Sequence, residues 1–114
     1  MQYSLLIYQT GDQFAARTDP ARREANNAAF GRFVGALKEA GVLVTTLGIE
    51  PPETSATVCR DDRRNGPYAD TREQLGGVCV IEAPDLDTAV AWARRGPFEH
   101  CGPIEVRPTR VVTA

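Results

Sequence analysis

The order in which strand-like and helix-like segments alternate is the feature that most restricts the fold of this chain. Short apolar runs predict strands at residues 2–8, 42–47, 78–83 and 104–107. Apolar residues recur at helical spacing in the intervals 19–41 and 84–96, between the first two strands and between the last two. This order predicts a four-stranded antiparallel sheet with both helices on one face.

The ends of the two helices are marked by residues with strong positional preferences. Asp19-Pro20 offers an N-cap followed by proline at the first helical position, and Gly41 offers a stop, so we expect one long amphipathic helix between them. Pro84-Asp85 introduces the second helix, and Gly96-Pro97 ends it. The chain is therefore predicted to be an α+β protein with the ferredoxin-like β-α-β-β-α-β plait.

The segment 54–64 carries weaker signals. Residues 56–59 could extend the sheet, and the charged residues 60–64 favour a solvated turn, so no separate element is predicted there. Further along, Gly76-Gly77 lies at the entry of the third strand, where we expect a β-bulge.

The length and charge of the chain limit its partners. A chain of 114 residues is expected to form one domain, residues 1–114. Thirteen basic residues against fifteen acidic ones give a net charge of −2 without a large basic cluster, so nucleic acid is not expected as a partner. The start lacks a signal-peptide pattern and no apolar run is long enough to span a membrane, which predicts a cytoplasmic protein without a membrane partner.

The cysteine and histidine content argues against a metal centre. The three cysteines show no CxxC spacing, and His100 is the only histidine. The chain also lacks a GxGxxG or Walker motif. We therefore predict neither a metal site nor a bound cofactor.

The densest cluster of functional side chains is the segment 65–77, which combines turn formers, carboxylates, an arginine, a tyrosine and a diglycine. Asp70 and Glu73 could act as bases if burial raised their pKa values, or they could be solvated charges, with Asp70 helping to cap a turn. Arg72 could hold a carboxylate or phenolate, or it could pair with Glu73 or Glu105.

His100 is the first candidate for proton transfer, because imidazole titrates near neutrality. The alternative is an exposed turn histidine between Pro97 and Pro103. The loop that carries it is expected near Glu105 and Arg107 of the last strand, and Arg107 is a candidate ligand-binding residue.

Two tyrosines are candidates for stacking on an aromatic ligand. Tyr8 and Tyr68 each combine a flat apolar ring with a hydroxyl, and packing at the boundary of the core is the alternative, favoured for Tyr8. Asn65 is a further candidate, because it opens the loop that contains Tyr68.

A sheet with both helices on one face leaves its other face uncovered. The first and third strands place apolar residues on that face, which would be exposed in a monomer. A second copy packed sheet to sheet would cover them, so we expect a homodimer.

The chain resembles the YCII-related superfamily, specifically its DGPF-domain branch. The resemblance rests on segments 3–8, 40–43, 51–52, 65–77, 82–87 and 104–108. It implies a dimeric α+β barrel with a pocket beside the 65–77 loop. This chain departs from the family in the hairpin before that loop, which is usually longer and is cut here to a charged turn around Asp61-Asp62. The family signature Asp-Gly-Pro-Phe is Asn65-Gly66-Pro67-Tyr68 here, so a neutral amide replaces a carboxylate. Relatives with a His-Asp pair carry a histidine soon after the first strand, where this chain has Gln9-Thr10-Gly11.

The resemblance implies two alternative functions. One is a small cofactor-independent enzyme, a lyase, isomerase or dehydrohalogenase, acting on a small aromatic or polyketide-like molecule. Its expected catalytic residues are His100, Asp70 and Glu73, and its expected ligand-binding residues are Tyr8, Asn65, Tyr68, Arg72 and Arg107. The other is a non-catalytic ligand-binding or regulatory module associated with an extracytoplasmic-function sigma factor, since genes of this branch frequently neighbour such factors.

Overall fold

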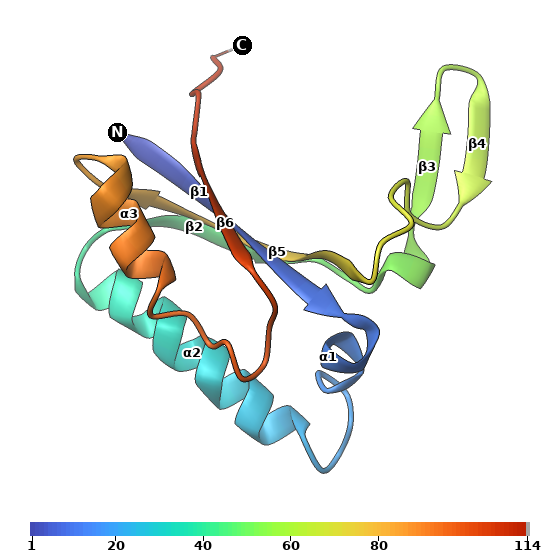
Figure 1. Ribbon diagram of the computed structural model, residues 1–114, viewed down its shortest axis with the longest axis horizontal. Helices are drawn as coiled ribbons and strands as arrows, with labels where there is room; N and C mark the ends of the chain where they lie inside the picture. The colour runs from blue at the N-terminus through green and yellow to red at the C-terminus, as the bar shows by residue number, and fades with distance from the viewer. Residues whose placement is uncertain (114) are drawn as a thin grey trace.

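The computed structural model describes residues 1–113, which are arranged around a four-stranded antiparallel sheet. The strand order is β2-β5-β1-β6, with bounds β1 Gln2–Thr10, β2 Leu43–Gly48, β5 Glu73–Glu82 and β6 Ile104–Pro108. Helices α2 (Arg23–Glu39) and α3 (Leu86–Ala93) lie on the same side of the sheet (Figure 1). The predicted ferredoxin-like fold is confirmed.

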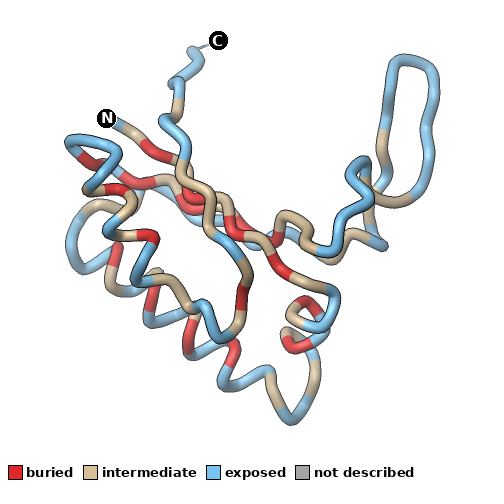
Figure 2. Tube along the Cα trace, in the orientation of Figure 1, coloured by how far each residue is buried: buried red, intermediate tan, exposed pale blue. Residues whose placement is uncertain are grey.

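The core lies between the sheet and these two helices. Side chains of β1 alternate between buried and half-buried, and Tyr3, Leu5 and Ile7 are buried. They pack with Phe33 and Leu37 of α2, two of the residues that recur at helical spacing. Figure 2 shows these buried positions as red segments along the sheet and along α2. None of the helices in residues 1–113 has the length and apolar composition needed to cross a membrane.

A short helix that the sequence patterns did not predict follows β1. Helix α1 (Gly11–Ala15) begins after Thr10, whose hydroxyl accepts a hydrogen bond from the backbone N–H of Gln13. The Gln13 side chain accepts one from the backbone N–H of Thr10 at 2.9 Å, which completes a capping box. The helix buries Phe14 and turns the chain at the end of β1.

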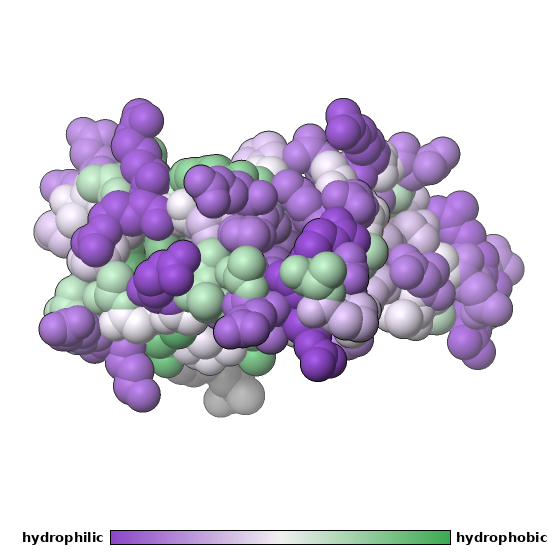
Figure 3. Space-filling view, turned by 90° about the horizontal axis from the view of Figure 1, so that it is seen from below, coloured by the Kyte–Doolittle hydropathy of each residue, from purple (hydrophilic) through white to green (hydrophobic). Residues whose placement is uncertain are grey.

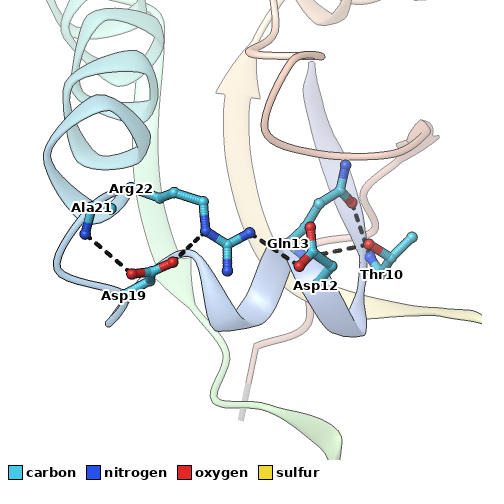
Figure 4. A network of polar contacts seen from close by, with 6 residues as sticks. All are labelled: Thr10, Asp12, Gln13, Asp19, Ala21 and Arg22. Atoms are coloured by element: carbon cyan, nitrogen blue, oxygen red, sulfur yellow. Dashed lines mark hydrogen bonds and ion pairs between the residues drawn. The ribbon is translucent and has the colours of Figure 1, made fainter.

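The long helix begins later than predicted, at Arg23. Asp19 does not cap it, because its carboxylate accepts hydrogen bonds from the backbone N–H of Ala21 at 3.1 Å and from Arg22 Nε at 2.6 Å. Arg22 also pairs with Asp12 at 3.0 Å, which links α1 to the start of α2 (Figure 4). The competing bonds to Arg22 therefore make Asp19 part of a turn before the helix.

The other helix ends agree with prediction. Gly41 has a φ of +74° directly after the C-cap of α2, a conformation that glycine adopts without strain. Asp85 is the N-cap of α3 and accepts a hydrogen bond from the backbone N–H of Thr88 at 2.8 Å.

Residues 52–65 form structure where no element was predicted. After a 3-10 turn η1 (Pro52–Thr54), strands β3 (Ala56–Cys59) and β4 (Asp62–Asn65) pair as a separate two-stranded sheet. The expected extension of the main sheet is therefore wrong, and the expected charged turn is confined to Arg60 and Asp61, because residues 62–64 pair in β4. A two-residue connection with a φ of +53° at Arg60 closes this hairpin locally. Its strands lack the apolar alternation by which strands are recognised in a sequence.

The hairpin projects away from the sheet (Figure 1). Every residue of β3 and β4 is exposed except the half-buried Thr57. Seen from below, this end of the molecule is mostly hydrophilic, whereas apolar side chains gather at the end that carries α2 and α3 (Figure 3). The hairpin therefore adds little to the core.

Strand β5 begins at Glu73, earlier than predicted, so the diglycine lies inside the strand. The pairing of β1 with β5 shifts register between Ile7 and Tyr8, and Gly76 is left without a partner on β1. The predicted bulge is confirmed, within the strand rather than at its entry.

We call the side of the sheet away from the helices the open face. Leu6 and Tyr8 of β1 and Val78 and Val80 of β5 lie on it, since they alternate with the buried residues of their strands. All four are half-buried within one protomer. The homodimer that would cover them stays a prediction.

Candidate functional site

The open face carries a row of three polar side chains that connects β1 to β6. Tyr8 Oη donates a hydrogen bond to Glu105 Oε1 at 3.1 Å, and Arg107 Nε donates one to Glu105 Oε2 at 2.8 Å. The strand register brings them together, because Leu6 pairs with Glu105 and residues two apart on a strand share a face. We call Tyr8, Glu105 and Arg107 the open-face cluster.

Each member of the cluster changes the titration of the others. The hydrogen bond from Arg107 is the main cause that lowers the pKa of Glu105, and the bond from Tyr8 lowers it further. Burial raises the pKa of Tyr8, and its bond to Glu105 adds to the rise. The pKa of Arg107 is raised by the same carboxylate. At neutral pH the cluster therefore holds an ionised carboxylate between a phenol and a guanidinium.

Glu73, a predicted catalytic residue, lies at the same end of the open face. It pairs with Thr10, which shares the face of Tyr8. Its carboxylate also fills the space that a side chain at Gly102 would need, and Gly102 is hydrogen-bonded to the backbone oxygen of Tyr8. The structure thus brings two predicted site residues, Glu73 and Tyr8, to one region.

His100 lies on the helix side of the sheet, away from the open-face cluster. It lines a cavity of about 470 Å³ together with Arg32 of α2 and Arg95. A second cavity of about 330 Å³ that His100 lines is bordered by α1. Neither Asp70 nor Glu73 lines either cavity, so neither cavity brings the histidine together with the predicted carboxylates.

The first half of the predicted loop belongs to the hairpin. Asn65 is the last residue of β4 and is exposed. Tyr68 is 82% exposed, and the Arg64 guanidinium lies over its ring at 5.9 Å. Tyr68 therefore lies beside the hairpin, where it lines a cavity with residues of β3 and β4, and its role in stacking on a ligand stays a prediction.

The second half of the loop is held by polar contacts of its own. Gln74 Nε2 donates to the backbone oxygen of Ala69 at 2.7 Å, and Thr71 Oγ1 donates to that of Glu73 at 2.7 Å. Asp70 and Arg72 are exposed. The loop is thus shaped by Gln74 and Thr71, and the charged side chains of Asp70 and Arg72 face solvent.

Glu105, the centre of the open-face cluster, was missed as a candidate. From the sequence it was expected only as a possible partner of Arg72 and as a neighbour of the loop that carries His100. A signal was present, because a Glu and an Arg two positions apart on a strand share a face and can pair. Its contact with Tyr8 depends on the pairing of β1 with β6, which the local pattern does not contain.

Ligands for a metal do not converge in the described part of the chain. Within residues 1–113 no three histidine, cysteine, aspartate or glutamate side chains are grouped so as to hold an ion. Cys79 and Cys101 are buried, and burial raises the pKa of the Cys101 thiol to about 11, which leaves it protonated at neutral pH.

Comparison with known proteins places this geometry in context. The profile of the YCII-related domain matches residues 1–113. Among solved structures, the chain is similar to 5-chloro-2-hydroxyhydroquinone dehydrochlorinase from Burkholderia phenoliruptrix in complex with 2,5-dihydroxybenzoquinone. The TM-score is 0.56 at 14% identity, covering 96% of this chain and 94% of that chain, so the likeness shows a shared fold. No curated protein matches the chain.

Proposed function

Because this chain belongs to the YCII-related domain family, we propose that it is a small cofactor-independent enzyme of the lyase, isomerase or dehydrohalogenase type. Its substrate is a small hydroxylated molecule of aromatic or polyketide-like character. Support comes from the structural neighbour, a dehydrochlorinase of a chlorinated hydroxyhydroquinone that was solved with a dihydroxybenzoquinone.

The observation that carries this proposal is the carboxylate of Glu105, held between Tyr8 and Arg107 on an apolar sheet face. The lowered pKa keeps Glu105 ionised at neutral pH but also makes it a weak base, so a substrate hydroxyl can give its proton to Glu105 only where neighbouring donors make that hydroxyl more acidic. Tyr8 and Arg107 supply donors that stabilise the anion left on the substrate. Leu6 and Val78 supply apolar surface for its ring.

The proposal includes a homodimer in which a second copy covers the open face. In one protomer the side chains of Glu105 and Arg107 are 41% and 67% exposed. Covering them would exclude water and strengthen the hydrogen bonds of the cluster. The enclosed site would then lie between two sheets.

Replacement of the proton acceptor tests the proposal. With 5-chloro-2-hydroxyhydroquinone as substrate and chloride release as the measurement, Glu105→Gln is expected to lower kcat about 10²-fold or more. Tyr8→Phe, which removes one hydrogen bond, is expected to lower it about tenfold. Glu53→Gln is the matched control, because Glu53 is an exposed carboxylate in η1.

An unchanged rate in Glu105→Gln would show that the reaction does not use the Glu105 carboxylate. If the wild-type protein turned over no member of a panel of hydroxylated rings, the non-catalytic module would become the better account. Neither the family match nor the structural neighbour carries a link to a sigma factor, so that alternative stays a prediction.

The pH profile gives an independent test. The lowered pKa keeps Glu105 ionised below the ordinary glutamate value of about 4.3, so activity should fall only as the pH drops through the lowered pKa. Arg107→Gln removes the main cause of the lowering, and the acidic limb of kcat should therefore move to higher pH. A limb that stays in place would remove Glu105 from proton transfer.

The assignment of proton transfer to His100, Asp70 or Glu73 stays a prediction from the sequence. His100→Gln separates the two sites, because His100 lines helix-side cavities that contain no member of the open-face cluster. An unchanged kcat would support the open face. A fall of about 10²-fold or more would instead support the histidine as the proton-transfer group.

A further inference from the structure

The cavity of about 470 Å³ on the helix side of the sheet lies between α2 and the segment 95–100, which follows α3. Figure 1 shows this segment passing beside α2 before the chain enters β6. The residues that α2 contributes are three or four positions apart and share one face of the helix: Ala29, Arg32, Phe33 and Ala36. Sites for small molecules span roughly 300–1,000 Å³, so the volume suits a small ligand.

The charged lining of this cavity is mainly positive. It contains the guanidinium groups of Arg32 and Arg95 and the carboxylate of Glu99, and His100 adds an imidazole. This positive excess is opposite in sign to the net charge of the whole chain, which is −2. Within residues 1–113 neither arginine forms an ion pair. Both guanidinium groups are therefore available to an anion from outside the chain.

An aromatic ring holds Arg95 in place. The guanidinium lies over Trp92, 4.6 Å from the centroid of the ring, and Trp92 itself packs against the hydrophobic core. Stacking uses the faces of the planar guanidinium and leaves the N–H groups at its edge free to donate. An anion bound at this edge costs less side-chain entropy than one bound by an arginine that rotates freely.

The segment 95–100 is fixed by close packing and by a buried amide. A Cβ at Gly96 would meet Ile104 Cδ1, so the segment lies directly against β6. The backbone oxygen of His100 accepts a hydrogen bond from Gln9 Nε2 at 3.0 Å. Side chains on a fixed backbone are already positioned when a ligand arrives, which lowers the cost of binding.

The rest of the lining is apolar. Phe33 is buried and belongs to the hydrophobic core, whereas Phe98 is 48% exposed beside the cavity. Ala36 and Pro97 complete this surface. An apolar group in the cavity would remove these side chains from water. The cavity therefore suits a molecule that has an anionic head and an apolar body.

We propose that this cavity binds a small monocarboxylate with an apolar body. Arg32 and Arg95 donate N–H groups to the carboxylate, and Phe33 and Phe98 pack against the body. The Glu99 carboxylate repels additional negative charge, which favours a carboxylate over a phosphate monoester. The proposal is independent of the proposed reaction, because no member of the open-face cluster lines the cavity.

Four probes separate the charge from the apolar body. Hexanoate has both, hexanamide keeps the size without the charge, acetate keeps the charge without the body, and hexyl phosphate carries additional charge. Calorimetric titration of the full chain should show hexanoate binding about tenfold more tightly than hexanamide or acetate, and more tightly than hexyl phosphate.

Each comparison can contradict one part of the proposal. Equal affinities for hexanoate and hexanamide would overturn the role of the arginines, and equal affinities for hexanoate and acetate would overturn the role of the apolar lining. Tighter binding of hexyl phosphate would overturn the preference for a carboxylate. No saturable binding of hexanoate would overturn the site as a whole.

Two substitutions test the cations. Arg32→Gln and Arg95→Gln should each lower the affinity for hexanoate about tenfold and change that for hexanamide much less. Both arginines are exposed, so both variants should fold. Arg23→Gln is the matched control, because Arg23 is an exposed arginine of α2 that does not line the cavity. An unchanged affinity for hexanoate in either cavity variant would refute the assignment.

Two further substitutions locate the ligand. Ala36→Phe fills the cavity from α2 and should abolish the binding of hexanoate. Glu99→Gln removes the repelling carboxylate and should raise the affinity for hexanoate about threefold. Persistence of binding in Ala36→Phe, or an unchanged or lower affinity in Glu99→Gln, would contradict this placement. The variants of Glu99 and of the two arginines remain decisive if Ala36→Phe fails to fold.

Discussion

At the residue scale, the side chain of Gln9 joins β1 both to Arg17 and to the segment that precedes β6. It is 1% exposed, its Nε2 donates to the backbone oxygen of His100 at 3.0 Å, and its Oε1 accepts from Arg17 at 2.6 Å. Buried amide groups are nearly always hydrogen-bonded, and both ends of the Gln9 amide are. In the sequence, Gln9 was notable only as a position without a histidine, and its cross-chain contacts depend on the tertiary structure.

Gly76→Ala tests this arrangement. The added Cβ would contact Gln9 Oε1, so either the amide or Arg17 must move. We expect the free energy of unfolding, measured by urea denaturation, to fall by about 1–3 kcal/mol. Gly35→Ala is the control, because nothing lies within 4 Å of a Cβ at this helical position. It should raise stability by about 0.5–1 kcal/mol. Equal effects of the two variants would show that the Gln9 contacts are not tight.

At the element scale, the β3–β4 hairpin is separable from the rest of the fold. None of its residues is buried, and its ends are close, since the backbone N–H of Gly66 donates to the backbone oxygen of Ser55 at 2.7 Å. Gly66 has a φ of +103°, which a glycine accommodates at this return to the body. The hairpin is therefore closed by local backbone contacts and not by packing against the core.

Replacement of residues 56–65 by two glycines should leave the core intact. Because no buried side chain is removed and the loop ends already meet, the free energy of unfolding is expected to change by less than about 1 kcal/mol. Urea denaturation measures the change. A loss of more than about 3 kcal/mol would mean that the hairpin supports the fold.

At the scale of the whole molecule, the two faces of the sheet differ in how they are covered. Helices α2 and α3 cover one face, whereas the open face presents half-buried Leu6, Val78 and Val80 beside the open-face cluster. Apolar surface next to a polar cluster is the pattern expected of an interface or a ligand site.

Light scattering after size exclusion tests whether a second copy covers the open face. We expect the wild-type protein to be a dimer at micromolar concentration, and Leu6→Glu to be a monomer, because a charge would be buried without a partner. Val58→Glu on the hairpin, where Val58 is 69% exposed, is the control and should stay dimeric. A monomeric wild-type protein would refute the sheet-to-sheet dimer and the enclosed site that depends on it.

Local patterns predicted much of the fold but little of the site geometry. Apolar alternation and helical spacing identified the four strands of the main sheet and both large helices, since burial on one face imposes those periods. They failed for α1 and the hairpin, which depend on a capping box and a tight turn rather than on burial. Tyr8 and Arg107 were predicted site residues, but Glu105, which joins them, was not.

The sequence by itself determined the order of the four main strands and the two large helices, the glycine stop of α2, the N-cap of α3 and the bulge at the diglycine, because each follows from residues close together in the chain. Only the tertiary structure decided which polar groups meet. Tyr8 reaches Glu105 across a strand pair separated by 97 positions, and Asn26 is left unpaired by the packing of α2 on the sheet. Such contacts depend on strand register and helix docking, which are set by the burial of the whole core and not by any local pattern.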